Sequence, residues 1–219
     1  MMLDIVRITN RDLRIAQRSG GNWAQAAIFF TLFILLSAFA LGPEQSRTSE
    51  LAPALVWLAA CLASQLSVYT LFAVDLQDGS LDCWVADNRP IAAYVLGKFL
   101  AHWLSALLPV ILLAPVGAFM LGAPPAILPA LVLSLVVGSP ALILFGGMAA
   151  ALAANIRGGG LLVVLISAPL LASPLIFGVG AVQAGLSFSV DMKILAAISL
   201  AAVVVCSSVS TLALKVHLE

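Results

Sequence analysis

Long apolar stretches, separated by short polar segments, dominate the chain. A helix needs roughly 20 apolar residues to cross a bilayer. Six stretches are long enough, at 23–41, 51–74, 93–121, 126–154, 161–186 and 194–214. The third and fourth meet at the turn sequence Gly-Ala-Pro-Pro of 122–125, which is typical of a helix end followed by a helix start. The pattern therefore predicts an all-α integral membrane protein with six transmembrane helices.

The segment 1–20 has a different periodicity and predicts an amphipathic helix lying in the membrane interface. Its basic residues fall on one narrow stripe, at Arg7, Arg11, Arg14 and Arg18. Its apolar residues lie away from that stripe, at Ile5, Ile8, Leu13, Ile15 and Ala16. The stripe fits an anchor on anionic lipid or a docking surface for a cytoplasmic partner, and both interpretations stay open. We expect no cleavable signal peptide here, and we expect residues 21–219 to form the transmembrane domain.

Composition supports the membrane assignment and excludes several other classes. The chain is 63% hydrophobic and only 9% charged, whereas soluble domains average about 25% charged residues. The net charge is zero, so we expect no nucleic-acid partner. The three cysteines are far apart and predict neither a disulfide framework nor a zinc site.

Basic residues predict the orientation of the six spans. Eight of the ten fall on one side of a six-span arrangement, and these are Arg7, Arg11, Arg14, Arg18, Arg89, Lys98, Arg157 and Lys215. Only Arg47 and Lys193 fall on the other side. The bias predicts that both termini face the cytoplasm.

The polar segment 75–90 predicts a cytoplasmic loop containing a short helix. Its carboxylates follow the spacing i, i+3, i+7 at Asp75, Asp78 and Asp82. Gly79 is suited to end the second span, and Ser80 to cap a short helix that carries Trp84. Acidic and aromatic groups together indicate a protein–protein contact. A solvated loop is the plain alternative, and a cation site built from the aspartates is the least favoured interpretation.

Two ionisable residues fall inside the third apolar stretch, one helical turn apart. Lys98 lies near its cytoplasmic end, where a lysine can extend to the headgroups. His102 is a candidate substrate-binding residue because imidazole can bind a metal or a heme iron, although a hydrogen-bonded packing histidine explains it equally simply. No Asp or Glu falls inside the six stretches as bounded above, which disfavours an ion-coupled carrier.

Familiar catalytic motifs are absent from the sequence. It has no G-x-x-x-x-G-K-[ST] phosphate-binding loop, no H-E-x-x-H and no G-x-S-x-G. The chain is therefore not expected to be an enzyme, and any ATP hydrolysis must come from a separate subunit.

Several segments resemble the heme exporter protein B family. The most specific is Asp75-Leu76-Gln77-Asp78-Gly79-Ser80-Leu81-Asp82. The others are 11–14, 42–44, 51–57, 98–103, 138–140 and 157–160. The sequence departs from the family at 68–70, where a more charged helix end is typical.

The resemblance implies a fold, a function and partners. The fold is an ABC-2-type permease, in which an interfacial helix precedes six spans. The function is that of a permease subunit of an ABC complex that delivers heme for cytochrome c maturation in the bacterial inner membrane. The partners are a cytoplasmic ATP-binding subunit, heme-handling membrane subunits, a second copy of the chain and membrane lipid.

The same resemblance implies roles for particular residues. The loop 75–90 would dock on the ATPase as a coupling loop, which makes partner-binding candidates of Asp75, Asp78, Gly79, Asp82, Trp84, Arg7, Arg11 and Arg14. Heme would be transported, or held by a partner. The alternatives are a permease for a lipid, glycan or drug and, less favoured, an ion-coupled carrier.

Overall fold

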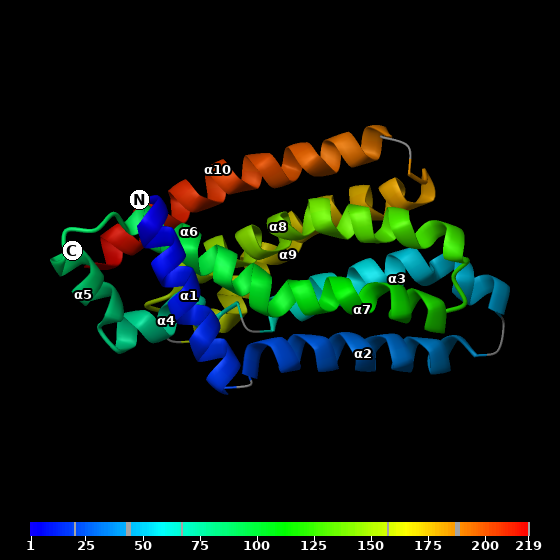
Figure 1. Cartoon of the computed structure of the whole chain (residues 1–219), viewed down its shortest axis with the longest axis horizontal. Coiled ribbons are helices and arrows are strands. Elements are labelled where there is room, and N and C mark those ends of the chain that lie inside the picture. The colour runs from blue at the N-terminus through cyan, green and yellow to red at the C-terminus, as the bar shows by residue number, and fades with distance from the viewer. Residues whose placement is uncertain (20, 43–44, 67, 157, 187–188, 219) are drawn as a thin grey trace.

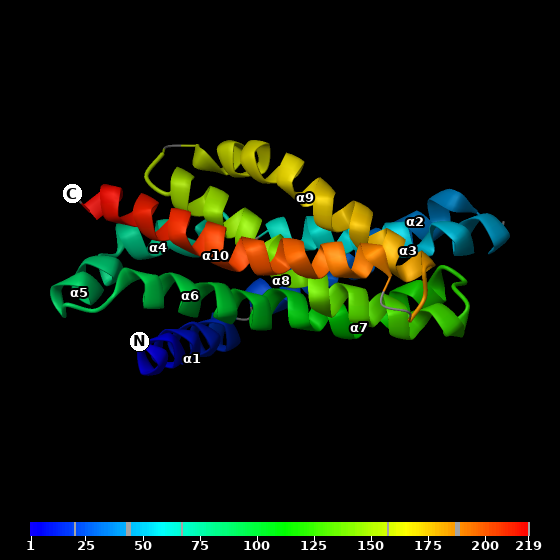
Figure 2. The same cartoon turned by 90° about the horizontal axis from the view of Figure 1, so that it is seen from above.

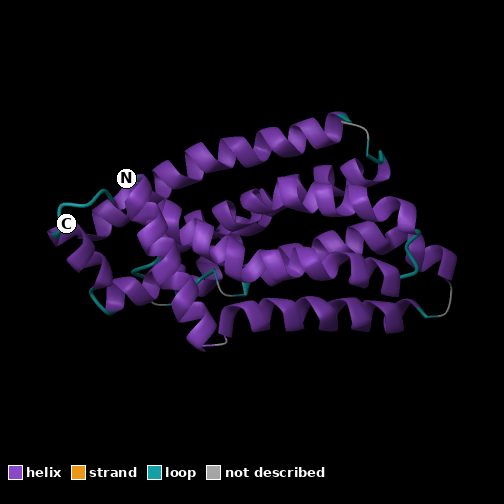
Figure 3. Ribbon diagram, in the orientation of Figure 1, coloured by secondary structure: helices purple, strands orange, loops and turns teal. Residues whose placement is uncertain are grey.

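The computed structural model describes residues 1–19, 21–42, 45–66, 68–156, 158–186 and 189–218. All regular structure in these ranges is helical (Figure 3). The first elements are α1 (Met2–Ser19), α2 (Gly21–Leu41), α3 (Gln45–Gln65), α4 (Thr70–Gln77), α5 (Ser80–Ala86) and α6 (Ile91–His102). A π-helical turn, η1 (Trp103–Leu107), then leads into α7 (Leu108–Met120), and a 3-10 turn, η2 (Pro125–Ile127), into α8 (Leu128–Ala153). The chain ends with α9 (Gly159–Gln183) and α10 (Val190–Leu218).

Six segments are long and apolar enough to cross a membrane, which confirms the predicted all-α class and span count. They are Ala24–Leu41, Thr48–Gln77, Ile91–Met120, Pro125–Ala153, Gly159–Gln183 and Val190–Leu218. They run roughly along one axis, and both termini lie at the same end of the bundle (Figures 1 and 2). α1, α4 and α5 lie at that end. The basic residues predicted to face the cytoplasm lie there too, as far as the structure describes them. Arg157 and the side chain of Arg47 lie outside the described residues.

The centre of the bundle is packed around Trp57 of α3, which is fully buried. Its indole Nε1 donates a hydrogen bond to Ser134 Oγ on α8, at 3.1 Å. Glycines leave the room for the ring: a Cβ at Gly178 would lie 2.3 Å from it, and one at Gly138 2.6 Å. Glycine therefore lets α8 and α9 approach an aromatic side chain closely.

Two of the spans are interrupted where the sequence predicted continuous helices. The second divides into α3 and α4, so it continues to Gln77, beyond the predicted end at 74. The third contains η1 immediately before Pro109. Proline has no N–H to donate to the carbonyl four residues earlier, which breaks the regular helical hydrogen-bond ladder there.

α1 is steeply inclined to the long axis of the spans (Figure 1) and lies at the outside of the bundle (Figure 2). It packs on α6, and Ile8 contacts the surface at Gly97 so closely that a Cβ there would lie 2.8 Å from Ile8 Cβ. Thr9 Oγ1 donates to Gly97 O at 3.2 Å. Part of the face expected to lie on lipid is therefore covered by protein, because Ile8 and Ala16 are buried, whereas Ile15 is exposed.

The predicted break in the segment 75–90 is confirmed at Gly79, whose φ of +74° favours glycine. A short helix follows as expected, but Ser80 does not cap it through its side chain. Instead the Ser80 N–H donates to the Asp78 carboxylate at 2.9 Å. Asp78 takes the capping role because an aspartate side chain can accept a hydrogen bond from the backbone N–H two residues later, here across the turn at Gly79.

Candidate functional site

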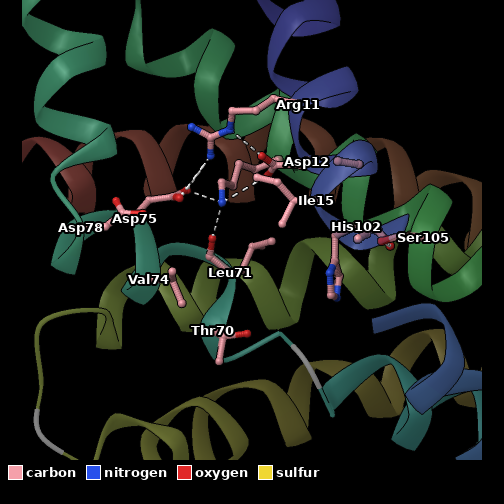
Figure 4. A pocket seen from close by; sticks show the side chains of 13 residues that line it. Arg11, Asp12, Ile15, Thr70, Leu71, Val74, Asp75, Asp78, His102 and Ser105 are labelled. Carbon is pink, nitrogen blue, oxygen red and sulfur yellow. Dashed lines mark hydrogen bonds and ion pairs between the residues drawn. The ribbon is translucent and has the colours of Figure 1, made fainter. Parts of the chain in front are cut away.

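A cluster of four charged side chains, of which Asp75 and Lys98 are buried and Arg11 and Asp12 half-buried, joins α1, α4 and α6 (Figure 4). Arg11 Nη2 lies 3.1 Å from Asp75 Oδ1, and Arg11 Nε lies 2.9 Å from Asp12 Oδ1. The Lys98 ammonium forms an ion pair with Asp75 and another with Asp12, the latter at 3.2 Å. Two cations and two anions thus alternate in a ring of four ion pairs that carries no net charge.

Further hydrogen bonds satisfy the remaining polar atoms of the cluster. The Tyr94 hydroxyl donates to Asp75 Oδ2, and Lys98 Nζ donates to Leu71 O at 2.9 Å. Asp75 and Lys98 are each only 6% exposed. Burying an ion is tolerated only when it is paired and hydrogen-bonded, a condition that these contacts meet.

Two expectations about the membrane charges are wrong. Lys98 does not extend to the headgroups, because its ammonium turns inward to Asp75 and Asp12. A carboxylate does lie within a candidate span, since Thr48–Gln77 includes Asp75. The absence of such a carboxylate therefore no longer argues against an ion-coupled carrier. In this structure, however, Asp75 is engaged by Lys98 and Arg11.

A cavity of about 320 Å³ adjoins the cluster, between α1, α4, α6 and η1. Its lining combines the four charged residues with Thr70, Leu71, His102 and Ser105. His102 is 3% exposed and lies to one side of the ion pairs (Figure 4). Among the described residues, no group of three His, Cys, Asp or Glu side chains is placed to hold a metal ion. A substrate-binding role for His102 stays a prediction.

The structure separates the predicted partner-binding residues into an inward and an outward group. Asp75 and Arg11 belong to the cluster, and Trp84 is buried, with its ring 5.5 Å from that of Tyr94. The outward group consists of Asp78, Asp82, Arg7 and Arg14, which are exposed. Gly79 forms the turn between α4 and α5. Only the outward group is placed to meet a partner directly in this conformation, and its binding role stays a prediction.

Electrostatics keep two groups outside the spans charged. Burial alone would lower the pKa of Arg11, but the oxygens of Tyr94, Asp12 and Asp75 outweigh burial and raise the pKa. The hydrogen bonds from the Ser80 side chain and backbone lower the pKa of Asp78. Both groups are therefore ionised throughout the neutral pH range.

Comparison with known proteins places this chain in a family. The family model described as CcmB protein matches residues 3–217. The heme exporter protein B of Pseudomonas aeruginosa is 44% identical over 176 residues, which is 80% of this chain and 79% of that protein. That of Paracoccus denitrificans is 41% identical, over 95% of this chain and 97% of that protein. That of Escherichia coli K12 is 33% identical, over 81% of each chain.

The chain belongs to the CcmB protein family. The family resemblance noted from 75–82 is thereby confirmed over nearly the whole sequence. In this member of the family, 75–82 contains both an inward residue, Asp75, and the outward residues Asp78 and Asp82. Adjacent residues in one motif therefore serve different structural purposes.

Sequence reasoning missed three members or supports of the cluster, Asp12, Tyr94 and the inward-turned Lys98. One available signal was the lone cation in the third apolar stretch, since a charge inside a span usually needs a partner. Ending the second span one residue before Asp75 hid that partner. Asp12 had no comparable signal, because an acidic residue on an amphipathic helix ordinarily faces water.

Proposed function

We propose that this chain is a permease subunit of an ABC transporter complex that delivers heme for cytochrome c maturation. The observation that carries the proposal is the family match over residues 3–217, together with relatives named heme exporter protein B. Six candidate spans support a role within the membrane. A phosphate-binding loop is missing from the sequence, so ATP hydrolysis is assigned to a separate cytoplasmic subunit.

The surface of α5 and its flanking turns is the proposed contact for that ATPase. Asp82, Val85 and Asp87 are exposed there, at the end of the bundle that holds both termini (Figure 1). Trp84 supports the contact from inside. Its Nε1 donates to Pro90 O at 3.3 Å, and the Arg89 guanidinium lies 4.9 Å from its ring centroid. Trp84 therefore shapes the α5 segment, and the carboxylates outside it set register and association rate.

The charge cluster gives this contact a rigid connection to the membrane domain. Asp75 lies four residues before Gly79 on α4, so movement of α5 acts on α4 directly. Asp75 is bound to Arg11 on α1 and to Lys98 on α6. A displacement caused by closure of the ATPase dimer would thus reach the interfacial helix and the third span together, because the ion pairs resist separation in a buried site.

The heme itself is assigned to transport by the complex or to a heme-handling membrane partner. The cavity beside the cluster has about 320 Å³, and four of its lining residues are the ion-paired Arg11, Asp12, Asp75 and Lys98. Ligand pockets usually offer ~300–1,000 Å³ of mainly apolar surface. A cavity at the small end of this range, with four paired charges in its lining, favours mechanical transmission by this chain, with a second copy of the chain completing the permease. An ABC-2-type permease for a lipid, glycan or drug is the remaining alternative.

The deciding experiment expresses the chain, with its ATPase and heme-handling partners, in cells that lack their own copy. We expect wild-type protein to restore heme-stained c-type cytochromes and to retain the ATPase on purification. Asp82→Lys should reduce ATPase recovery without loss of inserted permease, and Lys193→Met at the opposite end should not. Normal ATPase recovery without any restored cytochrome c would leave the permease role and refute the heme assignment.

The proposed orientation places both termini in the cytoplasm of a bacterial inner membrane. It rests on the positive-inside bias of the loops. Impermeant thiol reagents applied from outside should label Lys193→Cys and spare Arg89→Cys. The reverse labelling pattern would overturn the orientation and leave the six-span fold intact.

A further inference from the structure

The outward face of α1 combines basic and apolar side chains in a way that the charge cluster does not explain. Leu3 is 85% exposed, Ile15 55% and Val6 48%. Arg7, Arg14 and Arg18 are exposed between them and line the same shallow groove. We call these six residues the outer face of α1.

The opposite face of α1 is already occupied, so the outer face cannot be buried by a simple rotation of the helix. Ile8 and Thr9 are buried against α6, and Thr9 donates to Gly97 O. Arg11 ties the helix to Asp75. The helix is therefore held in one rotational setting at the outside of the bundle (Figure 2), and the six residues of its outer face are exposed.

The cations of the outer face are not held in ion pairs within the described part of the chain, and the one carboxylate near them, Asp4, acts on Arg7 only at longer range. Arg7, Arg14 and Arg18 form no ion pair there, in contrast to Arg11 on the same helix. Asp4 is the carboxylate nearest to this groove, and it is paired with the Met1 ammonium at 2.9 Å. Three guanidinium groups free of ion pairs, beside exposed apolar side chains, are complementary to an anionic, amphipathic surface.

The position of α1 indicates which kind of anionic surface its outer face meets. The candidate span Ala24–Leu41 begins five residues after α1 ends, so the helix lies at the depth where the bundle leaves the hydrocarbon. Its axis crosses the spans (Figure 1). A lateral face at this depth meets lipid headgroups, with apolar side chains reaching acyl chains and guanidinium groups reaching phosphates.

We propose that the outer face of α1 is a binding site for anionic phospholipid headgroups, independent of what the complex transports. Arg7, Arg14 and Arg18 contact phosphate oxygens, while Leu3, Val6 and Ile15 insert beside the acyl chains. Lipid binding then fixes the depth of the helix whose Arg11 holds the charge cluster. Zwitterionic phospholipid lacks the net charge that this site recognises.

The test uses the full chain with one fluorophore on the outer face. Cys83 is the exposed cysteine and is replaced by serine, and Asn10→Cys carries bimane, since Cys61 and Cys206 are buried. The protein is reconstituted in vesicles containing either brominated phosphatidylglycerol or brominated phosphatidylcholine. We expect brominated phosphatidylglycerol to quench with a relative association constant about tenfold or more above that of phosphatidylcholine.

Matched variants and a competitor make the result decisive. Combined Arg7→Gln, Arg14→Gln and Arg18→Gln should bring the ratio to about one, whereas Lys193→Gln should leave it unchanged. These exposed positions are not expected to affect folding, and size-exclusion profiles check this. Excess inorganic phosphate should not abolish the preference; abolition would assign the site to free phosphate. Equal quenching in the wild type would overturn the proposal and leave an acidic partner protein as the occupant.

Discussion

One apolar core runs through the whole bundle, but within the described residues only one of its two halves adds a network of charges to that packing. At the end that carries the termini, α1, α4 and α6 are joined by ion pairs and hydrogen bonds around Asp75 and Lys98. We call this region the charged end. Farther along, α3, α8, α9 and α10 pack through glycines and small side chains around Trp57, in what we call the apolar body. The charged end is therefore joined by a few specific residue pairs, whereas the apolar body is joined by many small packing contacts.

The difference has a mechanical meaning. A network of paired charges is directional, and separating one partner leaves the others with uncompensated charge, so the pairs resist separation. Close packing resists displacement at every contact, and no single contact controls it. A force applied at α5 would therefore pass through the ion pairs of the charged end to α1 and α6, and the closely packed helices beyond would move together.

The largest expected effect follows from removing Lys98, the more buried of the two cations that each contact both carboxylates. Lys98→Met leaves the buried Asp75 and the half-buried Asp12 with Arg11 as their one remaining cation in the cluster, and we expect about 3–5 kcal/mol of lost stability. Thermal unfolding in detergent measures it. Lys215→Met, at an exposed lysine of α10, is the matched control and should change little.

A second substitution distinguishes charge imbalance from lost packing at Lys98. Adding Asp75→Asn to Lys98→Met leaves Arg11 and Asp12 as a balanced pair, so the double variant should be more stable than the single one. A double variant that is the less stable of the two would show that the aliphatic stem of Lys98 matters more than its charge.

The apolar body should respond to volume instead of charge. Gly178→Ala places a methyl group 2.3 Å from the Trp57 ring, and overpacking of this kind costs about 1–3 kcal/mol. Gly160→Ala on the same helix is the control, because its methyl group would lie 3.8 Å from Tyr69, an ordinary contact. Unfolding midpoints that rank the two variants in the opposite order would contradict the close approach at Trp57.

The sequence was sufficient to predict the features that depend on periodicity and local chemistry. The six spans, α1 and the break at Gly79 all follow from apolar runs, a basic stripe or a turn residue. The π-helical turn before Pro109 carried only a weak signal, because prolines in membrane helices are often accommodated without one.

The charged end was predicted only in part, because its partners are distant along the chain. Arg11 and Asp75 are 64 residues apart and meet only when α1 folds back onto α6. Local sequence patterns predict only that each of these charges lies in water or at the headgroups, and they do not indicate which distant residue it pairs with. Trp84 was expected at a surface for the same reason, whereas α6 provides Tyr94 to cover it.

A smaller effect is expected where the charged end meets the apolar body. Trp103 Nε1 on η1 donates to Ser139 Oγ on α8 at 2.8 Å. Replacing Trp103 with Phe removes this donor and keeps an aromatic ring, so we expect a coupling energy of about 0.6 kcal/mol, as for other hydrogen bonds between membrane helices. A double-mutant cycle with Ser139→Ala measures the coupling. Additive effects of the two substitutions would show that the bond contributes nothing.

The smallest expected effect concerns the turn that starts α5. Asp78→Ala removes the acceptor of the Ser80 N–H, and we expect at most about 0.5 kcal/mol at this exposed site. Because the pKa of Asp78 is lowered below its ordinary 3.8, the stabilisation is fully present at pH 5–8 and is lost only as pH falls through the lowered value. Hydrogen exchange of the amides at 81–85 should therefore be faster in the variant, by the same factor at pH 6 and pH 8 after correction for intrinsic exchange. A factor that changes between these pH values would mean that another group titrates at this turn, and Asp78→Asn, which keeps an acceptor, should restore most of the protection.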